Sequence, residues 1–303
     1  GLLPVLRSDR YYRWPIPHWQ GWQHPNCFLG APLVARGTER AFWQALLDWA
    51  DRNAGAGLFL HLAEFPLGGV LHDALRAVLA EQRRSAALVA RHDRALLAGA
   101  LGPEAYFDAA VPGKKRKELR RQFARLAELG TIEVERREGL IGLTPWLDEF
   151  LLLEDSGWKG AAGSALARSA TTDRMFREAL SGAAQRGRLE RLALRLDGRP
   201  IAMLATFLTP PGSFSFKTAF DEAFARYSPG VLLQRENLAL LERPGIDWCD
   251  SCAAADHPMI ERLWRDRRAI GRLSIAIGGG LRRTAFAALA RAELGRNPTG
   301  IEP

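Results

Sequence analysis

Hydrophobic positions recur with a helical period along much of the chain, and short apolar runs of strand length lie between them. From residue 38 to residue 51 the apolar side chains fall on one face of a helix, which Thr38 can cap. Apolar runs at 58–63 and 86–91 have the length of buried strands, and a second helical pattern at 70–82 separates them. This alternation predicts a largely covered α/β sheet.

A second series of elements begins with a basic helix at 114–130, which Gly130 ends. Asp197-Gly198 lies between two apolar runs and is a strong hairpin signal. In chain order the pattern predicts a strand at 131–136, helices at 144–155 and 172–185, strands at 189–196, 201–208 and 213–220, a helix at 228–242, a strand at 246–251, a helix at 259–266, a strand at 273–277 and a helix at 281–294. We therefore predict an α/β (α+β) fold with a mixed central sheet flanked by helices.

Residues 1–30 carry Tyr11, Tyr12, Trp14 and further tryptophans between prolines, without a helical period. One interpretation is a loop that packs its rings on the domain. The other is an interfacial strip, because aromatic rings beside cations suit lipid headgroups or a sugar.

The formal charge of +8 and the sequence pI near 9.9 favour an anionic partner, which a nucleic acid, an anionic lipid or a phosphate-rich cofactor would each satisfy. The 303 residues suit two domains or one large one. The basic helix can meet phosphates or simply be a solvated face. Without zinc-finger spacing or a long basic tail beside it, a dedicated nucleic-acid binder is not expected.

The three cysteines, Cys27, Cys249 and Cys252, argue against a disulfide scaffold and for a reducing compartment. The chain start lacks the pattern of a signal peptide and no apolar stretch is long enough to span a bilayer, so we expect a cytoplasmic protein. Cys249-x-x-Cys252 followed by His257 also permits a redox pair or a zinc site. Buried cysteines without a metal are the preferred interpretation.

The segment after the third strand of the second series, Tyr227-Ser228-Pro229-Gly230, opens a predicted helix. A helix start attracts phosphate through its unsatisfied N–H groups and the positive end of the helix dipole. Ser228 suits the N-cap position, Pro229 the first turn, and Gly230 would let a ligand approach the backbone. The segment therefore indicates a pyrophosphate site or, alternatively, an ordinary well-capped helix.

Four strings resemble the cellulose-biosynthesis CelD/BcsL-type branch of the GNAT acyltransferases, which is related to the Fem-type transferases. They are "KKRKELRRQFARLAELG", "EDSGWKG", "FDEAFARYSPGVLL" and "DSCAAADHPMIERLWRDRR". The resemblance implies two tandem GNAT-like domains, the first one degenerate. The implied ranges are a first domain at 1–112, a connecting helix at 113–130, an acyltransferase domain at 131–280, and a C-terminal helix and tail at 281–303.

The resemblance also implies an acyl-CoA donor bound around the helix that follows the third strand. Carried onto this sequence, the binding residues are Arg226, Tyr227, Ser228, Gly230, Val231 and Leu232. The usual GNAT fingerprint has a Gln or Arg followed by spaced glycines, and only Arg226 and Gly230 match it here.

Acyl transfer to an amine needs a base near the acceptor. His257 is the first candidate, because histidine titrates near neutrality, although a His before a Pro can also cap a helix. Asp221 and Glu222, which follow the third strand, are the second candidates, or part of a solvated turn. Lys217 lies within an apolar strand, so its amine points either into the cleft or to solvent.

Residues of the two most characteristic strings can line the acceptor pocket: Trp158, Lys159, Trp264, Arg267 and Arg268. Core packing is the competing interpretation for both tryptophans, and the favoured one for Trp264. The predicted function is acyl-CoA-dependent N-acylation, less favourably O-acylation, of an amino sugar or a long-chain lipid amine, with peripheral contact to an anionic inner membrane in the lipid case. The alternatives are a Fem-type transferase that uses aminoacyl-tRNA and a non-catalytic scaffold.

Overall fold

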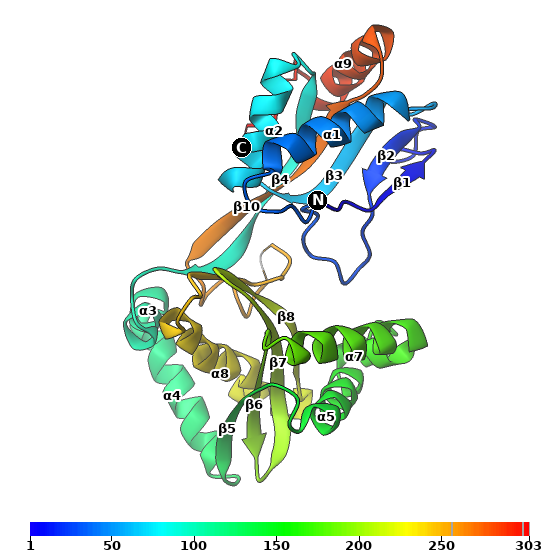
Figure 1. Cartoon of the computed structure of the whole chain (residues 1–303). Helices are drawn as coiled ribbons and strands as arrows, with labels where there is room; N and C mark the ends of the chain where they lie inside the picture. Colours follow the sequence, from blue (N-terminus) through cyan, green and yellow to red (C-terminus); the bar gives the residue numbers. More distant parts are fainter. Residues whose placement is uncertain (256, 299, 303) are drawn as a thin grey trace. The chain divides into compact units, whose positions relative to one another are not determined.

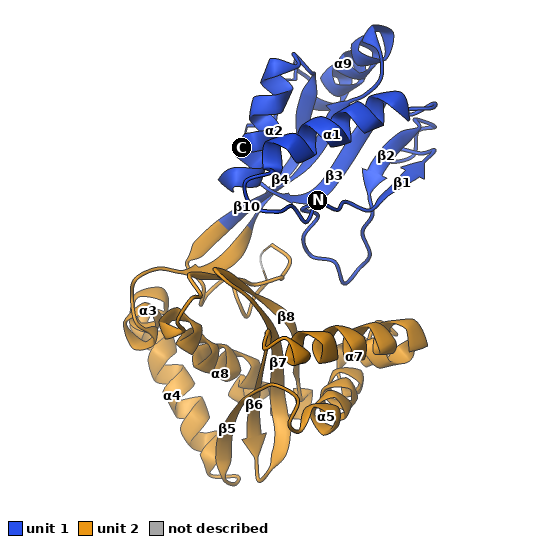
Figure 2. Ribbon diagram, viewed as in Figure 1, with its two compact units in different colours: residues 1–93, 268–303 blue, residues 94–267 orange. Residues whose placement is uncertain are grey.

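The computed structural model describes residues 1–255, 257–298 and 300–302, which form two compact units (Figures 1 and 2). Unit 1 comprises residues 1–93 and 268–303, and unit 2 comprises residues 94–267. Strands β4 (Ala86–Ala98) and β10 (Asp266–Ala276) contribute residues to both units. Each unit contains strands and helices in alternation, so the predicted mixed α/β class is confirmed.

Unit 1 has the strand order β1-β2-β3-β10-β4, with parallel pairing between β2 and β3 and antiparallel pairing between β3 and β10. Its other elements are β1 (Val5–Ser8), β2 (His18–Gly21), β3 (Phe59–Pro66), α1 (Glu39–Arg52), α2 (Gly69–Glu81) and α9 (Gly280–Leu294). The strands alternate their side chains between two cores. Leu60 and Leu62 pack with α1 and α2, whereas Phe59 packs against Phe286 of α9.

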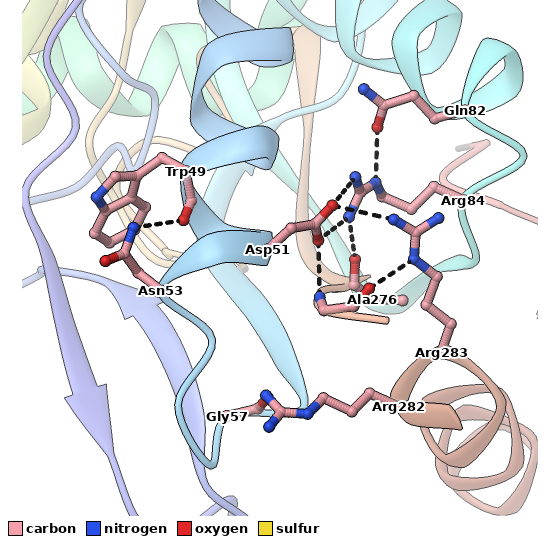
Figure 3. A network of polar contacts seen from close by, with 10 residues as sticks. Trp49, Asp51, Asn53, Gly57, Gln82, Arg84, Ala276, Arg282 and Arg283 are labelled. Carbon is pink, nitrogen blue, oxygen red and sulfur yellow. Dashed lines mark hydrogen bonds and ion pairs between the residues drawn. The ribbon is translucent and has the colours of Figure 1, made fainter. Parts of the chain in front are cut away.

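A partly buried ionic network joins α1 to Arg84, which follows α2, and to the start of α9 (Figure 3). Asp51 accepts two hydrogen bonds from Arg84, at 2.7 and 2.8 Å, and one from the Gly278 backbone N–H at 2.7 Å. Arg283 adds a further bond to Asp51 at 3.1 Å. The hydrogen bonds and charges of these cations hold the pKa of Asp51 below its usual value against the opposing effect of burial. The C-terminal helix α9 is therefore an integral part of unit 1.

Unit 2 has the strand order β4-β9-β8-β7-β6-β5. Its strands are β5 (Ile132–Glu138), β6 (Leu189–Leu196), β7 (Arg199–Thr209), β8 (Gly212–Phe220) and β9 (Trp248–Asp250). Its α-helices are α3 (Pro103–Ala110), α4 (Gly113–Ala127), α5 (Leu143–Ser156), α6 (Trp158–Ala161), α7 (Ala170–Gln185) and α8 (Pro229–Glu236). Shorter 3₁₀ turns are η1 (Leu166–Arg168), η2 (Glu222–Tyr227) and η3 (Asn237–Glu242).

Alternation along β6 divides the hydrophobic core of unit 2 into two layers. Leu189 and Ala193 pack with α5 and α7 on one face, and Leu192 and Leu194 pack with α4 and α8 on the other. Figure 1 shows these two pairs of helices on opposite faces of the sheet. The hairpin predicted at Asp197-Gly198 is confirmed, and both of its turn residues have positive φ angles, 48° and 77°, as a tight two-residue turn requires.

Strands β8 and β9 run parallel to each other for only a few residues. Among the described residues the pairing ends at Phe214↔Asp250, while β8 continues to Phe220. A register shift between β7 and β8, where Lys217 faces Ala205 and Ser215 faces Thr206, inserts one extra residue into β8. Such bulges bend a strand and re-aim its side chains. The C-terminal half of β8 is thus redirected beyond the end of β9.

Most predicted elements are present, and the differences are local. Strands β1 and β2 lie in the aromatic segment, where we expected only a loop, and α3 was not anticipated. The helix predicted at 259–266 is wrong, because residues 258–263 form turns and β10 begins at Asp266. The compact units also divide the chain differently from the predicted ranges, since α9 belongs to unit 1. No helix in the described part of the chain is long and apolar enough to cross a membrane.

Candidate functional site

A buried carboxylate–ammonium pair lies where α5 turns into α6. The Glu154 side chain is only 2% exposed and accepts hydrogen bonds from Lys159 Nζ at 2.7 Å and from the Leu166 backbone N–H at 2.8 Å. The turn depends on Gly160, because a Cβ there would lie 1.7 Å from the Asp155 carbonyl oxygen. The string "EDSGWKG" therefore encodes a tight return of the chain that places Lys159 against Glu154. Glu154 was not anticipated, although it is the acidic residue that opens this string.

Lys217 on β8 lies close enough to this pair for its ionisation to depend on it. Burial, and after it the positive charge of Lys159, lower the pKa of the Lys217 amine to about 8, whereas the charges of Glu154 and Cys252 act in the opposite sense. The side chain is half-buried and is therefore not freely directed to solvent. A lysine with this pKa is partly neutral near physiological pH and can accept a proton.

His257 is the second group whose ionisation depends on Lys159. Burial, and then the charge of Lys159, lowers the pKa of the His257 imidazole, so the ring is neutral at pH 7. Its Nδ1 atom is buried and has no hydrogen-bond partner among the described residues. The capping interpretation also holds in part, because the His257 carbonyl accepts bonds from the Ile260 and Glu261 backbone N–H groups. The ring itself remains available for proton transfer.

A small pocket lies between the α5–α6 turn and the C-terminal half of β8. Its lining residues are Leu153, Glu154, Gly157, Trp158, Lys159, Thr218, Ala219, Phe220 and Glu222. Trp158 is 60% exposed, and its backbone N–H donates to Glu222 Oε1 at 2.8 Å. Two of the predicted acceptor-binding residues, Trp158 and Lys159, are thus brought together with the exposed carboxylate of Glu222.

Asp221 has contacts that give it a structural role. It is buried, its Oδ1 accepts a hydrogen bond from the Ala223 N–H at 2.9 Å at the start of η2, and its Oδ2 pairs with Arg199. These contacts give no support to the catalytic interpretation of Asp221.

The start of α8 differs from the predicted phosphate site in two respects. Ser228 occupies the predicted N-cap position, but it adopts a left-handed conformation (φ 55°, ψ 49°) and its side chain makes no capping hydrogen bond. Gly230 is buried, and a Cβ built on it would lie 2.7 Å from Met259 Sδ and 3.4 Å from Phe220. The thioether of Met259 therefore covers the backbone that a phosphate would have to approach.

The other predicted cofactor-binding residues divide between core and surface. Tyr227 and Leu232 are buried in the core of unit 2, whereas Val231 is half-buried. Arg226 is exposed and stacks its guanidinium 4.7 Å from the centre of the Tyr227 ring. Only Arg226, Ser228 and the backbone of Gly230 and Val231 are therefore positioned for direct contact with a ligand, and a ligand at Gly230 requires Met259 to move.

The remaining predicted acceptor residues do not join the pocket. Trp264 is fully buried in the core, as the competing interpretation held, and this burial gives no support to its assignment to substrate binding. Arg267 is exposed and pairs with Glu261. Arg268 belongs to unit 1, whereas Trp158 and Lys159 belong to unit 2.

The cysteines show no ligand arrangement. Cys249 is buried, and burial raises the pKa of its thiol to about 12, which keeps it protonated. The described residues contain no group of three or more His, Cys, Asp or Glu side chains that could hold a metal ion. Cys252 is half-buried, has a left-handed backbone conformation (φ 53°), and donates its N–H to Asp250.

We expect the Gly230→Asp and Met259→Ala variants to change CoA binding in opposite directions. The aspartate places a side chain and a negative charge at the helix start, so affinity for CoA should fall at least about tenfold. The Met259→Ala variant uncovers Gly230 and should tighten binding by a few fold. Calorimetric titration with free CoA measures both, and thermal melts check that each variant is folded. Unchanged affinity in both variants would show that the donor does not bind at α8.

We expect His257→Ala to lower the turnover number about 10- to 100-fold, the range usual for loss of a general acid or base. CoA affinity should remain within about twofold, because no described contact links the ring to the start of α8. The comparison of kcat with the calorimetric Kd separates the two effects, and His24→Ala in unit 1 serves as the control. Turnover equal to wild type would remove His257 from the mechanism.

Comparison with known proteins supports the GNAT resemblance for unit 2. Residues 113–257, just under half of the chain, match the family model of the acetyltransferase (GNAT) domain, so this segment is similar to that domain. No curated protein sequence matches the chain.

Three solved structures share the fold over both units. The C-terminal domain (DUF2156) of a putative lysylphosphatidylglycerol synthetase from Agrobacterium fabrum has a TM-score of 0.56 at 15% identity, over 96% of this chain and 84% of that one. FemX has a TM-score of 0.54 at 10% identity, over 95% and 86%. A conserved protein of unknown function from Bacteroides thetaiotaomicron has a TM-score of 0.53 at 11% identity, over 90% and 82%. At these identities the likeness establishes the fold alone.

Proposed function

We propose that the protein is an acyl-CoA-dependent N-acyltransferase whose chemistry takes place in unit 2. The observation that carries this proposal is the Lys217 amine, whose pKa is lowered to about 8 beside the Glu154–Lys159 pair. It lies within the segment that matches the GNAT acetyltransferase domain, where β8 continues past the end of β9. Perturbed ionisation next to a pocket is typical of a catalytic centre.

In this mechanism the side chains of the protein transfer protons and control the protonation of the catalytic groups. Lys217, in its neutral form, accepts a proton from the acceptor amine as the new amide bond forms, and it then returns a proton to the departing sulfur. His257, also neutral, can share this role directly or through a water molecule. The charge of Lys159 adds to the effect of burial in lowering the pKa of both groups, while Glu154 holds Lys159 in place. The acyl donor supplies the thioester, and no covalent intermediate with the protein is needed.

The pocket favours an amine acceptor over a hydroxyl. The exposed carboxylate of Glu222 attracts an ammonium group, and the exposed indole of Trp158 provides a flat apolar surface next to it. A sugar ring or the start of a long alkyl chain can stack on such a surface. We therefore propose an amino sugar or polysaccharide precursor, or a long-chain lipid amine such as a sphingoid base, as the acceptor class.

One feature favours a second candidate, a Fem-type transferase that uses aminoacyl-tRNA. Helix α4 exposes Lys114, Lys117, Arg120, Arg121 and Arg125, and no ion pair to any of them occurs in the described structure. Basic residues on one helix are suited to a phosphodiester backbone. Salt-sensitive tRNA binding that is lost on charge reversal at Arg121 and Arg125 would support this candidate. A non-catalytic scaffold predicts binding of neither donor.

The deciding experiment is calorimetric titration of the full chain with acetyl-CoA and palmitoyl-CoA, each competed by free CoA. Saturable, competable binding supports the acyl-CoA proposal, and the preferred chain length separates small-acyl transfer from lipid chemistry. Absence of binding to any of the three would overturn it in favour of the tRNA-dependent enzyme or the scaffold.

A further inference from the structure

A short hairpin in unit 1 presents aromatic side chains to solvent on an anchored turn. Tyr11 and Trp14 exchange two backbone hydrogen bonds of 3.0 Å each, so that Tyr12 and Arg13 form the two-residue tip. Tyr12 takes the positive φ angle of 51° that such a tip requires. The sequence interpretation of a loop that packs its rings on the domain holds for Tyr11 but not for the exposed rings of Tyr12 and Trp14.

The anchor of the hairpin is Tyr11. Its ring is buried at 4.9 Å from Phe59 and 5.4 Å from His18, and its hydroxyl donates to Glu293 Oε1 at 2.8 Å. Burial raises the pKa of the Tyr11 phenol, so this hydrogen bond is retained across the physiological range. The tip is therefore fixed to β3 and α9 through a buried residue.

The side chains next to the anchor are exposed instead of packed. Tyr12 is 63% and Trp14 is 70% exposed, although the Tyr12 ring stays 4.6 Å from the Tyr11 ring. A folded protein gains no burial from leaving an indole and a phenol in water on a well-ordered turn. Single exposed aromatic rings are common, but here two of them lie on one hairpin whose backbone is fixed by the buried Tyr11.

Two cations accompany the exposed rings. Arg10 and Arg13 are exposed, and no carboxylate is paired with either in the described structure, whereas the nearby Asp9 pairs with Arg7 at 3.7 Å. Tryptophan and tyrosine side chains prefer the membrane–water interface, where the ring enters the headgroup layer and its polar edge stays hydrated. Arginines next to them are attracted to anionic headgroups.

We propose that the Tyr12–Trp14 hairpin docks unit 1 on the surface of an anionic phospholipid membrane, with the two rings in the headgroup layer and Arg10 and Arg13 on lipid phosphates. Charge complementarity selects this partner over a neutral surface, and the small apolar area gives reversible binding. The inference rests only on the hairpin and does not depend on the proposed acyl transfer.

The test is sedimentation of the full chain with vesicles of phosphatidylcholine alone or with about one third phosphatidylglycerol. Wild type should bind the anionic vesicles, and binding should weaken as salt is raised. Trp14→Ser should lower the partition coefficient about tenfold at all salt concentrations. Arg10→Ala/Arg13→Ala should lower it by about tenfold at low salt and remove most of the salt dependence.

The matched control is Ile141→Ser, which removes an 85% exposed apolar side chain from unit 2 and should change binding less than about twofold. Because the altered side chains are exposed, all variants should keep the wild-type melting temperature, which verifies that they are folded. The proposal would be overturned if the wild type did not bind anionic vesicles. It would also be overturned if neither Trp14→Ser nor the double arginine variant reduced vesicle binding, or if Ile141→Ser reduced it as much as Trp14→Ser does. Binding of a soluble sugar or protein that Trp14→Ser abolishes, without vesicle binding, would also overturn it.

Discussion

Replacement of Lys217 by methionine should reduce the acyl-transfer rate about 100- to 1000-fold and simultaneously stabilise the protein at pH 7. The rate falls because the group that accepts the acceptor's proton is lost, while methionine retains the length and apolar stem of the lysine. In wild type, kcat/KM should rise with pH and level off above about pH 8, where the Lys217 amine is neutral. In Lys217→Met this ascending limb should disappear, as a pH–rate profile will show.

The effect on stability has a definite sign. The pKa of Lys217 is about 8 in the folded protein and 10.5 in the unfolded chain, so below pH 8 both states are protonated and the folded state bears the cost of a half-buried charge. Between pH 8 and 10.5 the unfolded state binds more protons, and stability rises with pH. The difference between the two pKa values corresponds to at most about 3 kcal/mol in the free energy of unfolding. At pH 7 Lys217→Met should be more stable than wild type by up to this amount, and above pH 10.5 this difference should disappear. Urea unfolding at both pH values measures this.

Lys217→Arg provides the control for this interpretation. Arginine keeps the positive charge but cannot release its proton in the accessible pH range, so the variant should be as inactive as Lys217→Met without being more stable. If Lys217→Arg retained turnover and a wild-type pH profile, Lys217 would be a binding or structural residue, and the base would have to be sought at His257.

Glu154→Ala should destabilise the protein by about 3 kcal/mol, because it leaves the half-buried Lys159 ammonium and the buried Leu166 N–H without their acceptor. Lys159 loses its counter-ion and the Leu166 N–H loses its acceptor. For a folding unit of this size the melting temperature should fall by about 10 °C. The loss also removes the negative charge that raises the pKa of Lys217, so the pH limb of any residual activity should move to lower pH.

Two further variants separate the effect of charge from that of hydrogen bonding. Glu154→Gln keeps an acceptor for the Leu166 N–H, so it should lose only roughly half as much stability as Glu154→Ala. Because it lacks the negative charge, its pH–rate profile should resemble that of Glu154→Ala and not that of wild type. Glu149→Ala, on the same helix α5, breaks a more exposed pair with Arg195 and should cost less than about 1 kcal/mol. Equal destabilisation by Glu154→Ala and Glu149→Ala would show that the Glu154–Lys159 pair has no special structural importance.

The local elements of unit 2 were predictable because they depend on short-range patterns. Helices α5 and α7, the three strands from β6 to β8 and the turn at Asp197-Gly198 all follow from hydrophobic period and turn chemistry. The helix expected at 259–266 failed for the converse reason. Ile260, Leu263 and Trp264 are buried, as a helical pattern would suggest, but the chain forms turns there before it enters β10.

The candidate site was only partly predictable. Lys217, His257, Trp158 and Lys159 were identified from residue type and from the resemblance, and the structure relates the first two to Lys159 and places Trp158 and Lys159 in one pocket. Glu154 was missed because its partners lie five and twelve residues away along an irregular turn. The contact of Met259 with Gly230 was missed for the same reason, because the two residues are far apart in the sequence and no local pattern predicts that they meet.

The sequence by itself determined the α/β class, nearly all element positions in unit 2, the basic face of α4 and the membership of Lys217 and His257 in the list of candidate bases. Only the tertiary structure decided that α9 completes unit 1, that Asp221 and Trp264 have structural environments, and that Tyr12 and Trp14 are exposed. Hydrophobic periodicity is a property of residues that are close in the sequence, whereas burial and the distance between charges are set only when distant segments come into contact. The pKa of Lys217 depends on its burial and on its distance from Lys159, so only the tertiary structure could reveal it.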